Sequence, residues 1–163
     1  MKKKLSMLLT MLCVLLLVGC SGGGTGGNQL TIGLSGDAIS LDPVMSNDNQ
    51  SSNVTTQIYE GLVKLDPSGE IQPSLAESYE QVDDVTYRFK LKEGVKFHNG
   101  EELKASDVVF SLKRAIEAPN VTHLFQTIDV NSVQAIDDYT VEFKQTEPFA
   151  GIIPALCHPG GFI

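Results

Sequence analysis

The chain has 163 residues, a length that suits about one domain with a core of its own. Its formal net charge is −8 at pH 7. An acidic chain is poorly suited to nucleic acid or to a basic membrane-binding role, so the charge argues against both.

The first residues have the pattern of a secretory signal. Lys2 to Lys4 precede an apolar run of 14 residues from Leu5 to Val18. The run is shorter than the roughly 18 residues that a membrane-spanning helix needs, so a signal peptide over residues 1–19 is the better interpretation. Its removal would leave 144 residues (163 less 19) and, with three lysines gone from −8, a formal charge of −11.

A lipid anchor and a linker are expected next. Leu17-Val-Gly-Cys20 resembles the lipobox of bacterial lipoproteins, and the resemblance implies that Cys20 becomes the lipid-modified first residue of the mature chain. The alternative is an ordinary signal with a chance cysteine. Residues 20–29 are rich in glycine and predict a flexible linker, with a reach of roughly 15–18 Å.

Short elements are predicted up to residue 82. Alternation indicates a strand over Leu30–Leu34, and helical spacing indicates a helix over Asn53–Glu60 that Gly61 ends. Two further strands are expected, over Leu62–Leu65 and Glu77–Val82. The sequence Asp66-Pro-Ser-Gly69 is typical of a turn.

Two similar hairpins follow, one with its turn at Asp83-Asp84 and the other at Asp137-Asp138. From Val85 to Leu91 apolar and polar residues alternate, as in a half-buried antiparallel strand. The segment 137–144 parallels 83–90 residue by residue, so both hairpins are expected in one sheet.

The longest predicted helix runs from Glu102 to Glu117, with Ser106 or Asp107 as its N-cap and Ala118-Pro119-Asn120 as its end. Its apolar stripe consists of Val108, Val109, Leu112, Ala115 and Ile116. A final helix is expected over Pro148–Cys157, weakened by Pro154.

No set of residues indicates catalysis, a metal or a cofactor. His98, His123 and His158 lie far apart and lack a second ligand three or four residues away. Glu101 and Glu102 are adjacent, so they do not share a helix face. Neither a phosphate-binding loop nor a nucleophile elbow is present. Cys157 is expected to be a small buried apolar residue rather than a reactive thiol.

Five sequence blocks, in a fixed order, carry a specific resemblance. They are Ser40-Leu-Asp-Pro43, Gln57-Ile-Tyr-Glu-Gly-Leu62, Pro73-Ser-Leu-Ala-Glu-Ser78, Thr86-Tyr-Arg-Phe-Lys-Leu-Lys-Glu-Gly-Val-Lys-Phe-His-Asn-Gly100 and Ser106-Asp-Val-Val-Phe-Ser111. Together they resemble the family 5 extracellular solute-binding proteins, which are receptors of bacterial ABC importers for oligopeptides, dipeptides and, in some members, nickel.

The resemblance implies an α/β fold, namely the N-terminal part of a two-lobed, class II periplasmic-binding-protein-like fold. It would hold a mixed sheet with antiparallel hairpins and flanking helices, and its lobes would close on a ligand by a hinge motion. Residues 30–44 would form the first strand and the entry to lobe I. Residues 45–163 would form an accessory subdomain, incomplete at its C-terminus because family members are much longer.

In this family, the segment after Ser-Leu-Asp-Pro contacts the ligand, and here that segment is 44–50. Ser46, Asn47, Asp48 and Asn49 are therefore the candidate ligand-binding residues, acting mainly through their main chain as in strand addition. The alternative is a polar loop packed between domains. Three further segments are expected to have structural roles rather than to contact the ligand: Leu41-Asp42-Pro43, Tyr59–Leu62 and Phe97–Gly100. The last of these is expected to be a turn with a positive φ at Gly100.

The expected function is therefore that of a substrate-binding lipoprotein, not an enzyme, which captures peptides outside the membrane. Its partners would be a peptide, an ABC permease with its ATPase subunits, and the membrane through the lipid anchor, but no nucleic acid. Its location would be extracytoplasmic, anchored by lipid to the cell membrane, which in a Gram-negative host would mean the periplasmic space. Alternatives are a nickel chelate or an oligosaccharide as ligand, a truncated lipoprotein that binds nothing and, more remotely, an extracellular enzyme.

Overall fold

A computed structural model describes residues 30–163. The predicted signal peptide, Cys20 and the linker over 20–29 lie outside the described residues. The chain divides into two units at residues 33 and 34, and the fold below is that of residues 34–163. No helix in this described part is long and apolar enough to cross a membrane.

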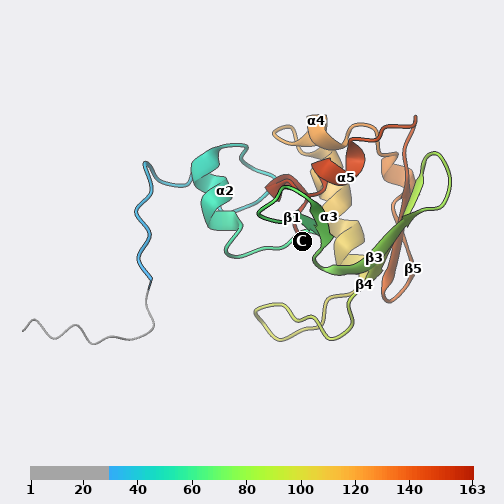
Figure 1. Ribbon diagram of the computed structural model, residues 1–163, viewed down its shortest axis with the longest axis horizontal. Coiled ribbons are helices and arrows are strands. Elements are labelled where there is room, and N and C mark those ends of the chain that lie inside the picture. Colours follow the sequence, from blue (N-terminus) through green and yellow to red (C-terminus); the bar gives the residue numbers. More distant parts are fainter. Residues whose placement is uncertain (1–29) are drawn as a thin grey trace, which may run out of the picture. The chain divides into compact units, whose positions relative to one another are not determined.

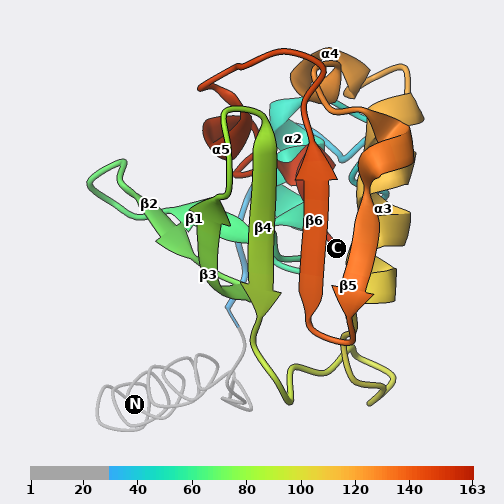
Figure 2. The ribbon, with the colours of Figure 1, turned by 90° about the vertical axis from the view of Figure 1, so that its right-hand side faces the viewer.

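Four antiparallel strands form the main sheet, in the order β3-β4-β6-β5 (Figure 2). Their bounds are Ala76–Gln81 for β3, Thr86–Leu91 for β4, Gln134–Asp137 for β5 and Thr140–Lys144 for β6. The two predicted hairpins are confirmed, and they meet in one sheet because β4 pairs with β6.

A separate two-stranded ribbon joins β1 (Val63–Leu65) to β2 (Ile71–Pro73). The predicted turn between these strands is confirmed. The Asp66 carboxylate accepts the main-chain N–H of Ser68 at 2.8 Å and of Glu70 at 3.0 Å, and Gly69 has a φ of 84°. The predicted strand at 30–34 is wrong. Its apolar residues are exposed, and no strand among residues 30–163 pairs with the segment to supply ladder bonds.

Helix α3 (Ala105–Glu117) packs on β5 and β6 (Figure 1). Its predicted stripe is confirmed, with Val108, Leu112 and Ala115 buried and the other two members partly buried. The predicted start is three residues early, because Glu102 pairs with Lys96 in a β-bridge. Neither N-cap candidate is right: the N-cap is Lys104, whose N–H donates to the Asp107 carboxylate at 2.8 Å. The helix ends before Pro119, as predicted.

Helix α2 spans Asn49–Thr55, so the prediction of a helix over 53–60 is wrong. Asp48 caps α2, so the helix begins earlier in the chain than the spacing of the apolar residues indicated. Gly61 consequently lies in the connection to β1 and is not the helix stop. A side chain there would approach the Val63 carbonyl oxygen to 3.0 Å and the Leu156 carbonyl oxygen to 3.1 Å, so the site requires glycine for close packing.

Two short helices complete the described fold, α4 (Thr122–Phe125) and α5 (Ile152–Ala155). The final helix predicted over 148–157 is therefore much too long. The main-chain N–H of Phe149 donates to the Gln145 side chain at 3.3 Å, and Pro154 has no N–H to extend the ladder. Short 3-10 turns occupy Val130–Ser132 and Pro159–Gly161.

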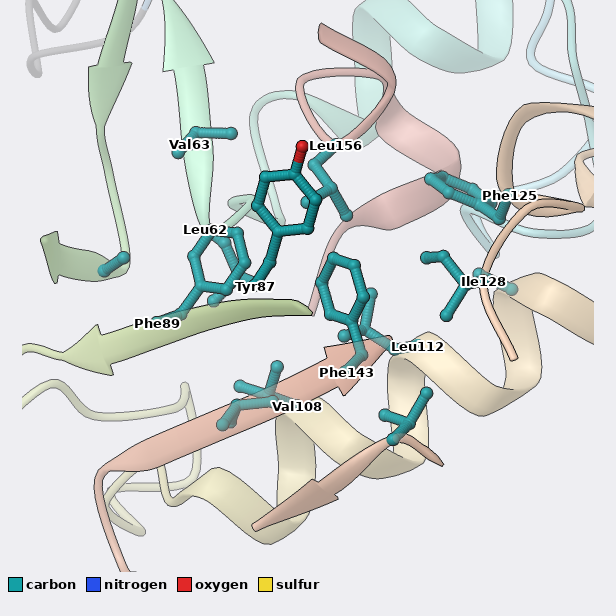
Figure 3. Packing of buried hydrophobic residues seen from close by; sticks show 14 of the residues in the cluster. Leu62, Val63, Tyr87, Phe89, Val108, Leu112, Phe125, Ile128, Phe143 and Leu156 are labelled. Atoms are coloured by element: carbon teal, nitrogen blue, oxygen red, sulfur yellow. The ribbon is translucent and has the colours of Figure 1, made fainter. Parts of the chain in front are cut away.

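Aromatic rings from both hairpins form the centre of the core (Figure 3). Phe143 on β6 stacks against Tyr87 and Phe89 on β4, with ring centroids 5.7 Å and 5.8 Å apart. Val108 and Leu112 of α3 are buried in the same core. The alternation predicted for 85–91 places Tyr87, Phe89 and Leu91 in the core, as expected, whereas Val85 precedes β4 and is half-buried.

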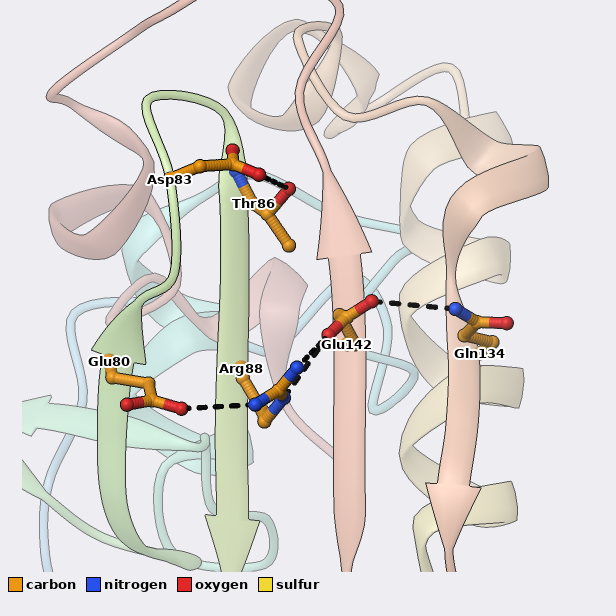
Figure 4. Close-up of polar contacts among 6 residues, drawn as sticks. All are labelled: Glu80, Asp83, Thr86, Arg88, Gln134 and Glu142. Atoms are coloured by element: carbon orange, nitrogen blue, oxygen red, sulfur yellow. Dashed lines mark hydrogen bonds and ion pairs between the residues drawn. The ribbon is translucent and has the colours of Figure 1, made fainter.

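The opposite face of the sheet carries one polar row that crosses all four strands (Figure 4). Glu80, Arg88, Glu142 and Gln134 lie directly opposite one another in the strand registers. Arg88 donates to Glu142 at 2.7 Å and to Glu80 at 3.2 Å, and Gln134 donates to Glu142 at 3.5 Å. The row joins the two hairpins and raises the pKa of Arg88, chiefly through the Glu142 bond.

Candidate ligand-binding loop

The candidate loop, residues 44–50, begins at a turn that the sequence predicted. The Met45 N–H donates to the Asp42 carbonyl oxygen at 3.0 Å. The Asp42 carboxylate accepts the Val44 N–H at 3.2 Å, and the Ser40 hydroxyl accepts the Asp42 N–H at 3.0 Å. Because Pro43 also restricts the residue before it, the entry to the loop has a defined direction.

Residues of α3 and its C-terminal connection hold this entry in place. Arg114 forms a hydrogen-bonded ion pair with Asp42, which lowers the pKa of the Asp42 carboxyl. The Asn120 side chain donates to the Met45 carbonyl oxygen at 2.8 Å, and Val44 is buried. These long-range contacts were not predicted, because the separation of Asp42 and Arg114 in the sequence gives no signal of their pairing.

The end of the loop is fixed by Asp48, the N-cap of α2. Its carboxylate accepts the Ser51 N–H at 2.8 Å, and this bond is the main cause of the lowered pKa of Asp48. Ser51 is buried, and its hydroxyl accepts the Ile39 N–H at 2.9 Å. An acidic residue three positions before a serine was the available signal for this cap. The second carboxylate oxygen of Asp48 is buried and has no hydrogen-bond partner among the described residues.

The other candidate residues lie on either side of Asp48: Ser46 and Asn47 precede it, and Asn49 is the first residue of α2. Asn47 and Asn49 are exposed, and Ser46 is half-buried. The main-chain groups of Ser46 and Asn47 form no hydrogen bond with any residue of the described part. A loop clamped at both ends, with unpaired main-chain groups between, can offer N–H and C=O groups to an extended ligand.

Two pockets lie near the loop without including residues 46–49. One of about 320 Å³ borders its entry and is lined by Leu41, Asp42, Val44 and Arg114, among others. Another of about 310 Å³ follows α2 and includes Tyr59, Phe97 and His98. The residues 97–100 form the predicted turn, with a φ of 91° at Gly100.

The remaining reactive side chains do not gather near the loop. Within residues 30–163 no group of three or more His, Cys, Asp or Glu side chains is placed to hold a metal ion. Cys157 is half-buried and packs against the core, and burial raises the pKa of its thiol, which disfavours the reactive thiolate.

The architecture is that of a substrate-binding domain: a mixed α/β unit with antiparallel sheets, like that of periplasmic peptide-binding proteins. The model of the family "Bacterial extracellular solute-binding proteins, family 5 Middle" matches residues 70–163, more than half of the chain. The chain belongs to this family.

Individual relatives agree with this assignment. The glutathione-binding protein GsiB of Escherichia coli K12 is 34% identical over 133 residues, which are 80% of this chain and 26% of GsiB. OppA of Listeria monocytogenes, solved with bound peptide, is 32% identical with a TM-score of 0.69 over 78% of this chain and 29% of that one. The ABC transporter-associated periplasmic binding protein DppA of Helicobacter pylori, in complex with the peptide STSA, is 29% identical with a TM-score of 0.68, over 78% and 29% of the two chains. The chain thus spans about a quarter of the length of the curated relatives it matches.

Proposed function

We propose that this chain is part of a substrate-binding lipoprotein that captures peptides outside the membrane and delivers them to an ABC permease. The observation that carries the proposal is the 32% identity to OppA of Listeria monocytogenes, a structure that holds a peptide. The relation to a glutathione-binding protein points in the same direction, because glutathione is itself a short peptide.

The loop at 44–50 supports a main-chain mode of recognition. A receptor that accepts many peptide sequences has to bind what they share, which is the backbone. Ser46 and Asn47 have main-chain groups without partners in the described part, and Asp42 and Asp48 fix both ends of the loop. We assign ligand contact to residues 46–49, with Asp48 also capping α2.

The leader supports the location. A signal-like segment followed by Leu17-Val-Gly-Cys20 would place the mature protein outside the cytoplasm, with a lipid on Cys20. One acyl chain alone binds membranes only marginally, so stable anchoring would require more than one chain at this cysteine.

The decisive experiment is calorimetric titration of the full-length receptor with a mixed peptide library, glutathione, a nickel chelate and oligosaccharides. Heat of binding with peptides or glutathione supports the proposal. Heat only with the nickel chelate or a sugar would move the ligand class to one of the alternatives, and no heat with any of them would contradict a receptor role.

Two substitutions at one position test the main-chain mode. Asn47→Pro removes the N–H of residue 47, whereas Asn47→Ala removes only the side chain. We expect Asn47→Pro to weaken peptide binding at least about tenfold, because a ligand carbonyl group left without its hydrogen-bond donor costs roughly 1–3 kcal/mol of binding free energy. We expect Asn47→Ala to leave the affinity within about threefold. Equal losses would assign recognition to the side chain instead.

A further inference from the structure

One edge of the main sheet is open. Among the strands of residues 30–163, β3 pairs only with β4, and five of its six residues are exposed. The residues Ala76–Gln81 include neither lysine nor proline, the residues with which natural edge strands usually block pairing with another chain. Protection within β3 is limited to two glutamates, Glu77 and Glu80, and to the irregular register between Ala76 and Ser78.

The hydrogen-bond pattern shows which main-chain groups this edge offers. The Val82 N–H donates to the Thr86 carbonyl oxygen, and bonded pairs alternate along an antiparallel ladder. Glu80 therefore bonds to β4 through its main chain. The N–H and C=O groups of Tyr79 and Gln81 point away from β4, and no residue of the described part pairs with them.

A groove runs beside these free groups on the core side of the strand. Its volume is about 600 Å³, and its lining includes Tyr79, Tyr87, Phe149 and Ile153. Tyr87 is only 6% exposed, yet its hydroxyl forms no hydrogen bond within residues 30–163. The hydroxyl is not among the buried polar atoms that lack a partner, so it is open to solvent where Tyr87 lines the groove, beside the rings of Tyr79 and Phe149.

Charge decides what could occupy the edge. The stretch 76–84 carries four carboxylates, Glu77, Glu80, Asp83 and Asp84, and no basic residue. A second copy of this chain, paired through β3, would bring carboxylates close to carboxylates. A segment with basic side chains on one face would instead meet Glu77 and Glu80. These side chains are 59% and 64% exposed, although Glu77 also pairs with Lys90 and Glu80 with Arg88, each at 3.2 Å. Arg88 is shared with Glu142, so carboxylates still outnumber basic groups beside this edge.

We propose that the β3 edge binds an extended segment of a partner polypeptide in which apolar and basic residues alternate. The segment adds a fifth strand by pairing with the main chain of Tyr79 and Gln81. Its apolar side chains enter the groove over Tyr87 and Phe149, and its basic side chains lie on the opposite face beside Glu80. This site is separate from the loop at 44–50 and does not depend on the importer ligand.

The test uses the full-length receptor and a seven-residue peptide of alternating lysine and valine, blocked at both ends. Gln81→Pro removes one outward N–H without removing a bond to β4, and proline is tolerated at such edge positions. The same alternation of bonded pairs turns the main-chain N–H of Ala135 on β5 away from β6. Ala135→Pro is therefore the matched control at the opposite edge of the sheet. We expect Gln81→Pro to weaken binding at least about tenfold and Ala135→Pro to leave it within about twofold.

Further measurements keep the proposal falsifiable if Gln81→Pro does not fold. Tyr79→Thr retains a good strand former but loses the ring, and should weaken binding several-fold. In the wild type, the peptide should slow hydrogen exchange at the amides of Tyr79 and Gln81. The proposal would be overturned if a peptide of alternating glutamate and valine bound with the same affinity as the lysine peptide. It would also be overturned if hydrogen exchange at both amides were unchanged. If Asn47→Pro weakens the lysine peptide and Gln81→Pro does not, the peptide occupies the loop: the edge proposal then fails while the receptor function stands.

Discussion

Asp48 caps helix α2 and is also a candidate ligand contact in the loop at 44–50. The sequence predicted it as a ligand contact, and the structure adds a role as N-cap of α2 that the apolar spacing of 53–62 had obscured. Asn47 and Asn49, its neighbours, have no such role in the described part. The ligand role of the loop stays a prediction. The contacts that hold its entry could not be predicted, because Arg114 and Asn120 reach it from more than seventy residues away.

Two substitutions distinguish the contribution of the N-cap hydrogen bond to stability from that of the negative charge of Asp48. Asp48→Ala should lower the melting temperature by about 2–4 °C, because an N-cap acceptor is lost. Asp48→Asn should lower it by less than about 1 °C, because its amide oxygen can still accept the Ser51 N–H. Thermal melts of the two variants distinguish these outcomes, and equal losses would mean that the negative charge, not the cap, stabilises α2.

His158 is the second residue whose environment has a measurable consequence. Its Nδ1 accepts the Gly160 N–H at 3.0 Å in the last 3-10 turn. Burial and, to a lesser degree, the positive charge of His123 lower the pKa of His158 from its ordinary value of 6.5. Protonated imidazole cannot accept at Nδ1, so the folded state favours the neutral form.

This shift predicts the sign of a pH effect. Between the folded pKa and 6.5 the unfolded chain binds more protons, so the free energy of unfolding should fall as pH drops below about 6.5. The slope is at most about 1.4 kcal/mol per pH unit, and less here because the imidazole is half-exposed. Denaturant titrations at pH 7.0, 6.0 and 5.5 should show this slope in the wild type and not in His158→Asn, which keeps an acceptor for Gly160. An unchanged slope in His158→Asn would assign the effect to other groups.

Among the elements, those with strong periodicity were predicted best. The alternation of 85–91 and the stripe of α3 directly reflect burial against the core, so sequence and structure agree. Helices α2 and α5 have seven and four residues, too short for periodicity to define. The start of α2 depends on a local hydrogen bond to Asp48, and α5 contains Pro154, which cannot donate a main-chain hydrogen bond. The strand expected at 30–34 failed for another reason, since alternation alone does not supply a neighbouring strand.

The aromatic stack provides a quantitative test at this scale. Phe143→Ala removes the ring between Tyr87 and Phe89 and should cost about 3–5 kcal/mol of unfolding free energy, whereas Phe143→Leu should cost less. The matched control is Ile136→Ala on the adjacent strand, where the side chain is 50% exposed and the expected cost is within about 0.5 kcal/mol. Comparable losses for Phe143→Ala and Ile136→Ala in denaturant titrations would contradict the placement of the core.

For the whole molecule, the family could be predicted because five sequence blocks kept their order. The family model and the relatives confirm it. The ligand cannot be deduced in the same way, because the chain spans about a quarter of the length of its curated relatives. Membrane attachment likewise remains a prediction, since Cys20 lies outside the described residues.

Attachment has a direct test in cells. Cys20→Ser should abolish incorporation of labelled fatty acid and release the protein from the membrane fraction, because serine offers no thiol for lipidation. Cys157→Ser, which alters a half-buried thiol far along the chain, should leave both unchanged. Fatty-acid labelling that persists in Cys20→Ser would contradict the lipobox interpretation.

The polar row across the sheet also affects whether the two similar hairpins pair with each other or with hairpins of a neighbouring molecule. Strands β4 and β6 share the pattern Thr-x-x-Phe-Lys, so each could in principle pair with the same strand of a neighbouring molecule. They differ in charge at the central position of their pairing, where Arg88 faces Glu142. Self-pairing about the same centre would set arginine against arginine or glutamate against glutamate. One opposed charge pair therefore distinguishes the intramolecular sheet from an exchange of hairpins between copies, and so protects a newly made chain from oligomerising as it folds.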